Sequence, residues 1–294
     1  MGELFAREFP NSWDVPLREW ANSFVAWLVD EYSRSFQGAS DTLLFLLFHV
    51  ERALVWLPWW LVVGLIGLLV WHANGRRLAP ALVLAGAMIL IGTFGLWSQM
   101  ITTLALMTIA AAVCVLIGVP LGIAMARSAR FKAVLKPLLD VMQTMPSFVY
   151  LVPVVMFFGL GNVSAIFATV IYALPPVARL TDLGLRLVDR ELLEAAASAG
   201  ATGRQTLWLV SLPLALPTVL AGINQTIMLA LSMVVLASMI GARGLGEEVL
   251  RGLQRGDVGR GLEAGLAIVI LAVIMDRVTA GYSRRWDHNA AERG

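Results

Sequence analysis

Charged residues are scarce in this chain of 294 residues, because only 14% are Asp, Glu, Lys or Arg while 59% are hydrophobic. A soluble domain carries about a quarter charged residues, so this sequence could not cover a water-facing surface. It has room for about six or seven runs of the roughly 20 apolar residues that a membrane-spanning helix requires. We therefore expect an all-α integral membrane protein. The net charge of +2 is too small to favour a nucleic acid partner.

Residues that could carry catalysis or bind a metal are equally scarce. The single cysteine, Cys114, lies in an apolar run, which predicts an inert buried thiol and no disulfide within the chain. The three histidines are too scattered for a metal site. The chain also lacks the G-x-x-x-x-G-K-[ST] pattern of a phosphate-binding loop. We therefore expect neither an enzyme nor a cofactor-binding protein. The start of the chain lacks a basic stretch before an apolar one, which predicts no cleaved signal peptide.

Residues 1–56 are predicted to form an external region with amphipathic helices. From residue 17 onward, apolar side chains recur at helical spacing and polar side chains occupy the opposite face. This first helix is expected either to lie in the membrane interface or to brace the protein's own spans, and the sequence favours neither. A second helix is expected over residues 40–55, where Glu51 and Arg52 make the segment too polar to span comfortably.

About seven apolar segments are predicted to span the membrane. Residues 57–98 would hold two additional spans, residues 99–281 would form the core, and residues 282–294 would form a tail. Pro120 is expected to kink the third span, and Pro146 to loosen the fourth. The predicted spans cover residues 57–72, 80–97, 100–127, 138–158, 162–180, 214–240 and 262–280.

The placement of basic residues predicts the orientation of the chain. Lys and Arg concentrate at residues 76–77, 127–136 and 179–204 and in the tail, which occupy alternate connections. This pattern places the C-terminus in the cytoplasm and the N-terminus outside. Residues 241–261 do not fit this pattern, because they hold four arginines on the predicted outer side. Three acidic residues balance this charge only in part. A short surface helix is expected there.

Residues 191–213 form an amphiphilic segment between two long apolar runs. Asp189 can cap a helix that begins here, and Gly200 is a natural end for it. Because this segment joins two predicted spans, it is expected to form a helical elbow at the membrane surface. Such an elbow is available for another protein to bind.

The second half of this segment predicts a second helix. Thr202 and Gln205 have the spacing of a capping box, so a helix is expected over residues 204–210. Pro213 would then lie in the first turn of the next apolar run, where the missing N–H of proline is tolerated. The expected shape is therefore helix, glycine, helix and transmembrane span.

The segment resembles the EAA motif of bacterial ABC-importer permeases. That motif reads Glu-Ala-Ala, three residues, Gly, nine residues, an aliphatic residue, one residue, Leu-Pro. The resemblance implies that residues 182–213 form a cytoplasmic coupling loop that docks into a groove of an ATPase subunit. An ordinary Ala-rich loop is the alternative. The residues implied in coupling are Glu191, Glu194, Ala195, Ala196, Gly200, Val210, Leu212 and Pro213.

Polar residues within two predicted spans suggest a translocation path, because hydrocarbon penalises polar side chains that face it. Helical spacing predicts one stripe of such residues in the fourth span and another in the sixth. Interhelical hydrogen bonding is the alternative, and for the two amides of the sixth span the sequence favours neither. The candidate path residues are Gln143, Ser147, Phe148, Tyr150, Asn224, Gln225, Met228 and Ser232.

Three further stretches, residues 142–162, 172–181 and 217–253, resemble the glycine betaine/proline-type osmoprotectant permeases, the ProW-like subfamily. The resemblance covers about residues 55–280. It implies a five-helix type I (MetI-like) core, a permease homodimer in the bacterial inner membrane, ATPase subunits that hold ATP and Mg²⁺, and a periplasmic or extracellular substrate-binding protein. The implied function is the import of a small methylated ammonium solute, such as glycine betaine or choline, by alternating access.

Three other functions remain alternatives. An importer of an amino acid such as proline or methionine would share the coupling loop and the core, but residues 142–181 and 217–253 argue against it. An ion-coupled secondary transporter would need internal repeats and ionisable residues inside the membrane. The sequence has no evident repeat, and only Asp140 and Asp276 lie near span ends. A membrane scaffold without transport activity would not require the coupling loop.

Overall fold

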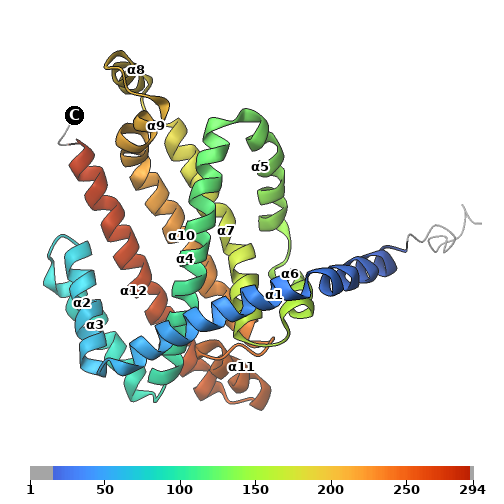
Figure 1. Ribbon diagram of the computed structural model, residues 1–294. Helices are drawn as coiled ribbons and strands as arrows, with labels where there is room; N and C mark the ends of the chain where they lie inside the picture. The colour runs from blue at the N-terminus through green and yellow to red at the C-terminus, as the bar shows by residue number, and fades with distance from the viewer. Residues whose placement is uncertain (1–15, 292–294) are drawn as a thin grey trace, which may run out of the picture.

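The computed structural model describes the backbone of residues 16–291 and the side chains of residues 16–283. Every regular element in this part of the chain is helical (Figure 1). The all-α fold expected from composition is therefore confirmed. The helices are α1 (Leu17–Trp56), α2 (Trp59–Ala73), α3 (Leu78–Thr93), α4 (Trp97–Arg127), α5 (Ala129–Thr144), α6 (Ser147–Phe158), α7 (Asn162–Arg186), α8 (Arg190–Ser198), α9 (Gly203–Thr206), the π-helix η3 (Leu207–Ser211), α10 (Leu212–Ser238), α11 (Leu245–Arg255) and α12 (Val258–Ala291).

The long helices α4, α7, α10 and α12 run along the bundle, and α7 lies at its centre (Figure 1). In the most apolar stretch of α7, 72% of the residues are buried, whereas the share is 39% in α4 and 22% in α12. Glycines allow this close packing. A Cβ atom at Gly122 of α4 would lie 2.5 Å from the carbonyl oxygen of Ala178 in α7. Small residues at such crossings let the two backbones approach, which strengthens packing where lipid provides no hydrophobic drive.

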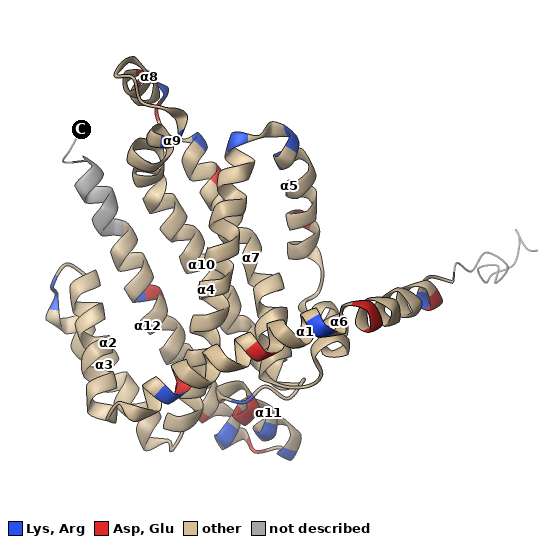
Figure 2. Ribbon diagram, viewed as in Figure 1, with Lys and Arg blue, Asp and Glu red and all other residues tan. Residues whose placement is uncertain are grey.

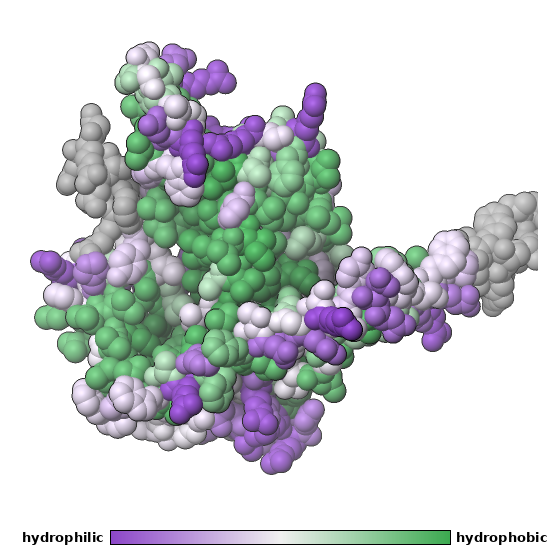
Figure 3. Space-filling view, in the orientation of Figure 1, coloured by the Kyte–Doolittle hydropathy of each residue, from purple (hydrophilic) through white to green (hydrophobic). Residues whose placement is uncertain are grey.

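Length and composition identify the helices that can cross a membrane. Four segments pass alone, namely α4, α7, residues 203–238 and residues 258–283, and counting each of two bent helix pairs as one span gives up to six. The helix α3 is apolar but has only 16 residues. The number of about seven spans expected from the sequence exceeds this upper number by one, because it includes α3 as a span. Figure 3 shows apolar side chains around the middle of the bundle and hydrophilic ones at the α8 end and over α11.

The helix α1 contains two helical segments, as expected, but they meet at a kink at the non-helical residue Tyr32, and no separate helix starts near residue 40. It crosses the end of the bundle opposite α8 (Figure 1). Leu43 and Leu47 are buried in a cluster with residues of α4 and α7. The ring of Phe36 stacks on that of Phe157, with centroids 4.8 Å apart. The second half of α1 therefore braces the protein's own helices.

The predicted fourth span is not one continuous helix, because α5 and α6 meet at an angle of 102°. The break lies at Met145 and Pro146. A residue before proline is pushed out of the helical region, and Met145 is extended at φ −68° and ψ 137°. Pro146 was expected only to loosen the helix. The prediction of a single stripe of polar residues along this span is therefore wrong.

The short helix α11 confirms the surface helix expected within residues 241–261. Glu248 is only 2% exposed and accepts hydrogen bonds from Arg251 at 2.8 Å and from Arg260 at 2.6 Å. Arg251 also pairs with Glu247. Two of the four arginines that contradict the expected charge pattern are thus neutralised within their own connection. This pairing weakens the conflict with the predicted orientation.

Replacing Glu248 with glutamine is expected to lower the free energy of unfolding by about 1–3 kcal/mol, because two charge-assisted hydrogen bonds lose their buried acceptor charge. Glu247→Gln is the matched control, and it should cost less than about 1 kcal/mol because Glu247 is partly exposed and joins a single pair. Thermal unfolding of the purified chain in detergent measures both values. Equal losses for the two variants would contradict the role assigned to Glu248.

Candidate functional site

The helix α8 projects from one end of the bundle and is capped at both ends (Figure 1). The Asp189 side chain accepts a hydrogen bond from the backbone N–H of Glu191 at 3.0 Å, as predicted. Gly200 follows the helix with φ +81°, a conformation that glycine adopts without steric penalty. None of the residues of α8 is buried. The helix α8 therefore has defined ends, and its side chains remain accessible to a partner.

The second half of the elbow differs from the prediction. The capping box is present, because the backbone N–H of Thr202 donates to Gln205 at 2.8 Å and that of Gln205 donates to Thr202 at 3.4 Å. However, the helix that begins there does not end at Val210. It passes through η3 into α10, and the N–H of Leu212 bonds the carbonyl of Leu207, five residues back. Pro213 lies in the first turn of α10, as expected, although η3 leads into that helix without a break.

The predicted coupling residues divide into an exposed set and an anchoring set. Glu194 and Ala195 are exposed on α8, and Ala196 is half-buried. Leu212 packs instead against the cluster formed by Leu185, Val188 and Leu207 beneath the elbow. In the rest of the predicted set, Glu191, Gly200 and Pro213 are exposed and Val210 is half-buried. The structure thus presents one half of the segment at the surface and fixes the other half to the bundle.

A charged cluster that the sequence analysis missed ties the elbow's base to the bundle. Asp182 of α7 is 4% exposed, and its carboxylate contacts Lys132 of α5 at 2.5 Å and Arg186 at 2.7 Å. Arg186 also donates to the carbonyl of Met125 in α4 at 2.7 Å. Figure 2 shows charged residues gathered at this end. The spacing of Asp182 and Arg186 by four residues was the available signal.

One more bond joins the elbow itself to the core. The guanidinium of Arg127, at the end of α4, donates to the carbonyl of Gly203 at 3.2 Å. Only three residues separate α7 from α8. A displacement of α8 would therefore act on α4, α5 and α7 through short connections. This arrangement is suited to passing a movement from the surface into the bundle.

Three of the four predicted path residues of α10 share a face, and the fourth does not. Gln225, Met228 and Ser232 are spaced along one exposed face of the helix. Asn224 instead points toward α12, where its amide donates to Asp276 at 3.0 Å and its oxygen accepts a hydrogen bond from Thr279. For Asn224, the structure favours the interhelical hydrogen bond over a path-lining role.

The predicted path residues of the fourth span lie around the break between α5 and α6. Gln143 is exposed, Phe148 is 49% exposed, and Ser147 is half-buried. Tyr150 is only 7% exposed, and its hydroxyl donates to the carbonyl of Met142 at 2.6 Å. This bond spans the break and joins α6 to α5. Tyr150 therefore fixes the bend and does not line an open surface.

Tyr150→Phe is expected to lower the free energy of unfolding by about 0.5–1.5 kcal/mol, because it removes one hydrogen bond across the break. The apparent affinity for a transported solute should stay the same, since the hydroxyl is already used within the chain. Thermal unfolding and the concentration dependence of uptake measure the two effects. A large loss of apparent solute affinity with unchanged stability would contradict this assignment.

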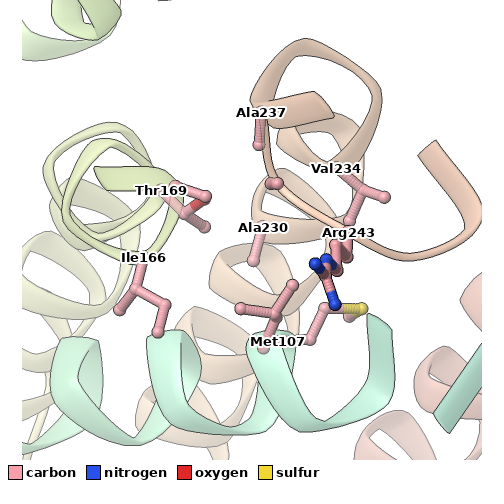
Figure 4. A pocket seen from close by; sticks show the side chains of 10 residues that line it. Met107, Ile166, Thr169, Ala230, Val234, Ala237 and Arg243 are labelled. Carbon is pink, nitrogen blue, oxygen red and sulfur yellow. The ribbon is translucent and has the colours of Figure 1, made fainter. Parts of the chain in front are cut away.

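A small pocket lies between α4, α7 and α10 (Figure 4). Its wall is mostly apolar, and Thr169 and Arg243 are its polar members. It contains none of the predicted path residues. The backbone N–H of Arg243 donates to the side chain of Asn162 at 3.0 Å, which fixes the loop that forms the pocket's edge. Among the residues described, His, Cys, Asp and Glu form no group that could hold a metal ion.

Comparison with known proteins places this geometry in a family. Residues 118–288, more than half of the chain, match the family model described as "Binding-protein-dependent transport system inner membrane component". The chain is 46% identical over 270 residues to the glycine betaine/proline betaine transport system permease protein ProW of Escherichia coli (strain K12), which covers 92% of this chain and 76% of ProW. It is 43% identical over 282 residues to the glycine betaine/carnitine transport permease protein GbuB of Listeria monocytogenes serotype 1/2a, covering 94% and 98%.

The fold also resembles a solved structure of the MetNI methionine ABC transporter in inward-facing conformations. The TM-score is 0.59 at 23% sequence identity, over 65% of this chain and 95% of that one, so the likeness concerns the fold alone. The resemblance to ABC-importer permeases inferred from the motifs, and the MetI-like fold that it implied, are confirmed. The chain belongs to the binding-protein-dependent transport system inner membrane components, multi-pass permeases that are not enzymes, need no cofactor of their own and work with an ATPase and a binding protein.

Proposed function

We propose that this chain is the membrane-spanning subunit of an ATP-driven importer for a small methylated ammonium solute such as glycine betaine. The names of relatives that are 41–47% identical over about 90% of the chain support the solute class, because each of them includes glycine betaine. Choline and carnitine share the quaternary ammonium group and are the next candidates. The relative named for methionine shares only the fold, so it does not favour an amino-acid substrate.

The coupling role rests on one observation: α8 has no buried residue, while the residues beneath it pack in an apolar cluster of the bundle. We assign α8 and residues 182–213 to the groove of the ATPase subunit, with Glu194 and Gly200 transmitting its movement. ATP binding would close the ATPase pair, move the elbows and open the path outward, and hydrolysis would return it. The chain thus supplies a two-state element whose populations the ATPase shifts. This role places α8 and the tail in the cytoplasm and residues 1–56 outside.

The path is proposed to lie along the exposed face of α10, between two copies of this chain. Gln225, Met228 and Ser232 are exposed there, although they belong to a long apolar helix. A second copy would cover this face and leave a polar strip in a closed channel. Phe148, with its exposed ring, can contact a methylated ammonium group by cation–π attraction, which needs no hydrogen bond at nitrogen. In this arrangement residues 99–281 form the core, and residues 57–98 add α2 and α3 at its side.

Uptake by proteoliposomes tests this function. The permease is reconstituted with its ATPase, ATP is enclosed inside, and the binding protein is added outside with labelled glycine betaine. We expect uptake that requires ATP and that choline, carnitine or trimethylamine N-oxide reduces, whereas methionine does not. Uptake that follows a proton or sodium gradient without ATP would contradict the proposal. ATP-dependent uptake blocked only by an unrelated amino acid would contradict the solute class alone.

A further inference from the structure

The turn between α2 and α3 contains an arginine in an unfavourable backbone conformation. Gly75 and Arg76 both have left-handed backbones, with φ of +67° and +63°. Within the described part of the chain, Arg76 is the one non-glycine residue with positive φ. Glycine would adopt this conformation without the steric penalty that a Cβ atom brings. Such strained residues cluster at functional sites, which raises the question of what the Arg76 side chain does.

Two further arginines belong to this turn and to the helix packed against it. Arg77 follows Arg76 in the turn, and Arg277 lies on the part of α12 against which the turn packs. The Asn74 side chain donates to the carbonyl of Arg277 at 3.4 Å, and a Cβ atom at Gly281 would lie 2.8 Å from Ala73. All three arginines are exposed. None of them takes part in an ion pair formed by the described side chains of residues 16–283.

The turn joins two apolar helices that are shorter than the hydrocarbon core of a membrane is thick. The helices α2 and α3 have 15 and 16 residues, which corresponds to about 22–24 Å at about 1.5 Å per residue. This length is less than the roughly 30 Å of the hydrocarbon core, so the bilayer has to thin at the turn or its long arginine side chains have to extend to the lipid headgroups. The turn joins the ends of α2 and α3 that point in the direction of α8 (Figure 1), and Figure 2 shows basic residues in it. The Cζ atom of Arg76 lies over the ring of Trp71, 6.0 Å from its centroid. Tryptophan is enriched at membrane–water interfaces.

We propose that Arg76, Arg77 and Arg277 bind the phosphate group of an anionic phospholipid in the leaflet on the α8 side. Guanidinium groups match phosphate oxygens with paired hydrogen bonds. Three positive charges that have no acidic partner among the described side chains favour an anionic headgroup over a zwitterionic one. The bound lipid would hold the α2–α3 turn against α12. The contact also explains why the turn carries Arg rather than Gly at position 76.

Binding is measured on the full-length chain purified in phosphatidylcholine–detergent micelles, to which phosphatidylglycerol is added stepwise. Native mass spectrometry counts the retained lipid, and thermal unfolding gives the stabilisation. Arg77→Gln and Arg277→Gln should each weaken phosphatidylglycerol binding about fivefold. Arg76→Gly should weaken it similarly, yet it should raise Tm in phosphatidylcholine alone by a few degrees, because the backbone strain is relieved. Arg255→Gln, which removes an exposed charge on α11 at the opposite end, is the control and should bind as the original chain does.

Four results would overturn the proposal. In the first, the variants of Arg76, Arg77 and Arg277 retain as much phosphatidylglycerol as the original chain does. In the second, Arg255→Gln weakens phosphatidylglycerol binding as much as those three variants do. Inorganic phosphate in phosphatidylcholine micelles would stabilise the chain through the same arginines as strongly as the lipid does, which would identify a soluble anion instead. Phosphatidylglycerol would have no effect while the purified ATPase subunit stabilised the chain through these arginines, which would identify a protein contact.

Discussion

Glu194→Lys is expected to abolish most ATP-dependent uptake while it leaves the fold intact. Glu194 is exposed on a helix without buried residues, and among the described side chains it has no ion-pair partner. Reversing its charge therefore disturbs nothing inside the chain. At a docked interface the loss of one charged partner costs about 2 kcal/mol or more, which corresponds to about thirtyfold weaker association with the ATPase. Uptake by proteoliposomes and ATPase activity of the same preparation measure the uncoupling.

Glu263→Lys is the matched control for this variant. Glu263 is an exposed residue of α12, close to its start beside α11 at the opposite end of the bundle, so the same reversal of charge occurs far from the elbow. Its uptake should stay near that of the original chain, and both variants should unfold at the original temperature. Unchanged uptake in Glu194→Lys would contradict the coupling role of this residue. A clear drop in its Tm would instead indicate a structural role that the geometry does not support.

Gly122→Val is expected to cause the largest loss of stability of any single substitution considered. A Cβ atom at this position would lie 2.5 Å from both the carbonyl oxygen of Ala178 and the Cβ of Thr181, so α4 and α7 would have to separate. Forcing extra methyl groups into such a site costs about 3 kcal/mol or more. Because α7 is the central helix and leads into α8, the separation would also disrupt coupling. Thermal unfolding should show a Tm lower by about 5 °C or more.

Gly86→Val separates this effect from the general consequence of replacing a helical glycine. A Cβ atom at Gly86 of α3 would meet nothing within 4 Å, so the change should stay within about 0.5 kcal/mol of the original stability. Retained stability and uptake in Gly122→Val would mean that α4 and α7 tolerate a wider spacing. The glycine crossing would then not be what sets the packing of α7.

Local signals in the sequence predicted the capped starts of both elbow helices and the glycine that ends the first. Asp189, Gly200 and the pair Thr202–Gln205 act on backbone groups within a few residues, so their roles follow from spacing alone. The continuation of the second helix through η3 was not predictable in this way. A π-turn that leads into Pro213 depends on how the helix packs against the bundle, which spacing does not report.

Contacts between distant segments explain the remaining differences. Asn224 and Asp276 are separated by 52 residues, so the sequence could not distinguish their hydrogen bond from a path-lining role. The break at Pro146 was visible as a proline, but its angle of 102° depends on where α6 packs. Phe36 of α1 supplies part of that packing through its contacts with Phe157 and Phe158 at the end of α6. Such tertiary contacts decide between the alternatives that composition and periodicity leave open.

The docking of α8 into the ATPase is tested most directly by site-specific cross-linking. The single cysteine, Cys114, is buried, so Cys114→Ser gives a background in which one introduced thiol reacts alone. Ala197→Cys on α8 and Gln254→Cys on α11 are both exposed and lie at opposite ends of the bundle. In the assembled complex, a short cross-linker should join Cys at position 197 to the ATPase subunit and leave position 254 unlinked to it. A cross-link from position 254 to the ATPase, with none from position 197, would contradict both the coupling role and the orientation.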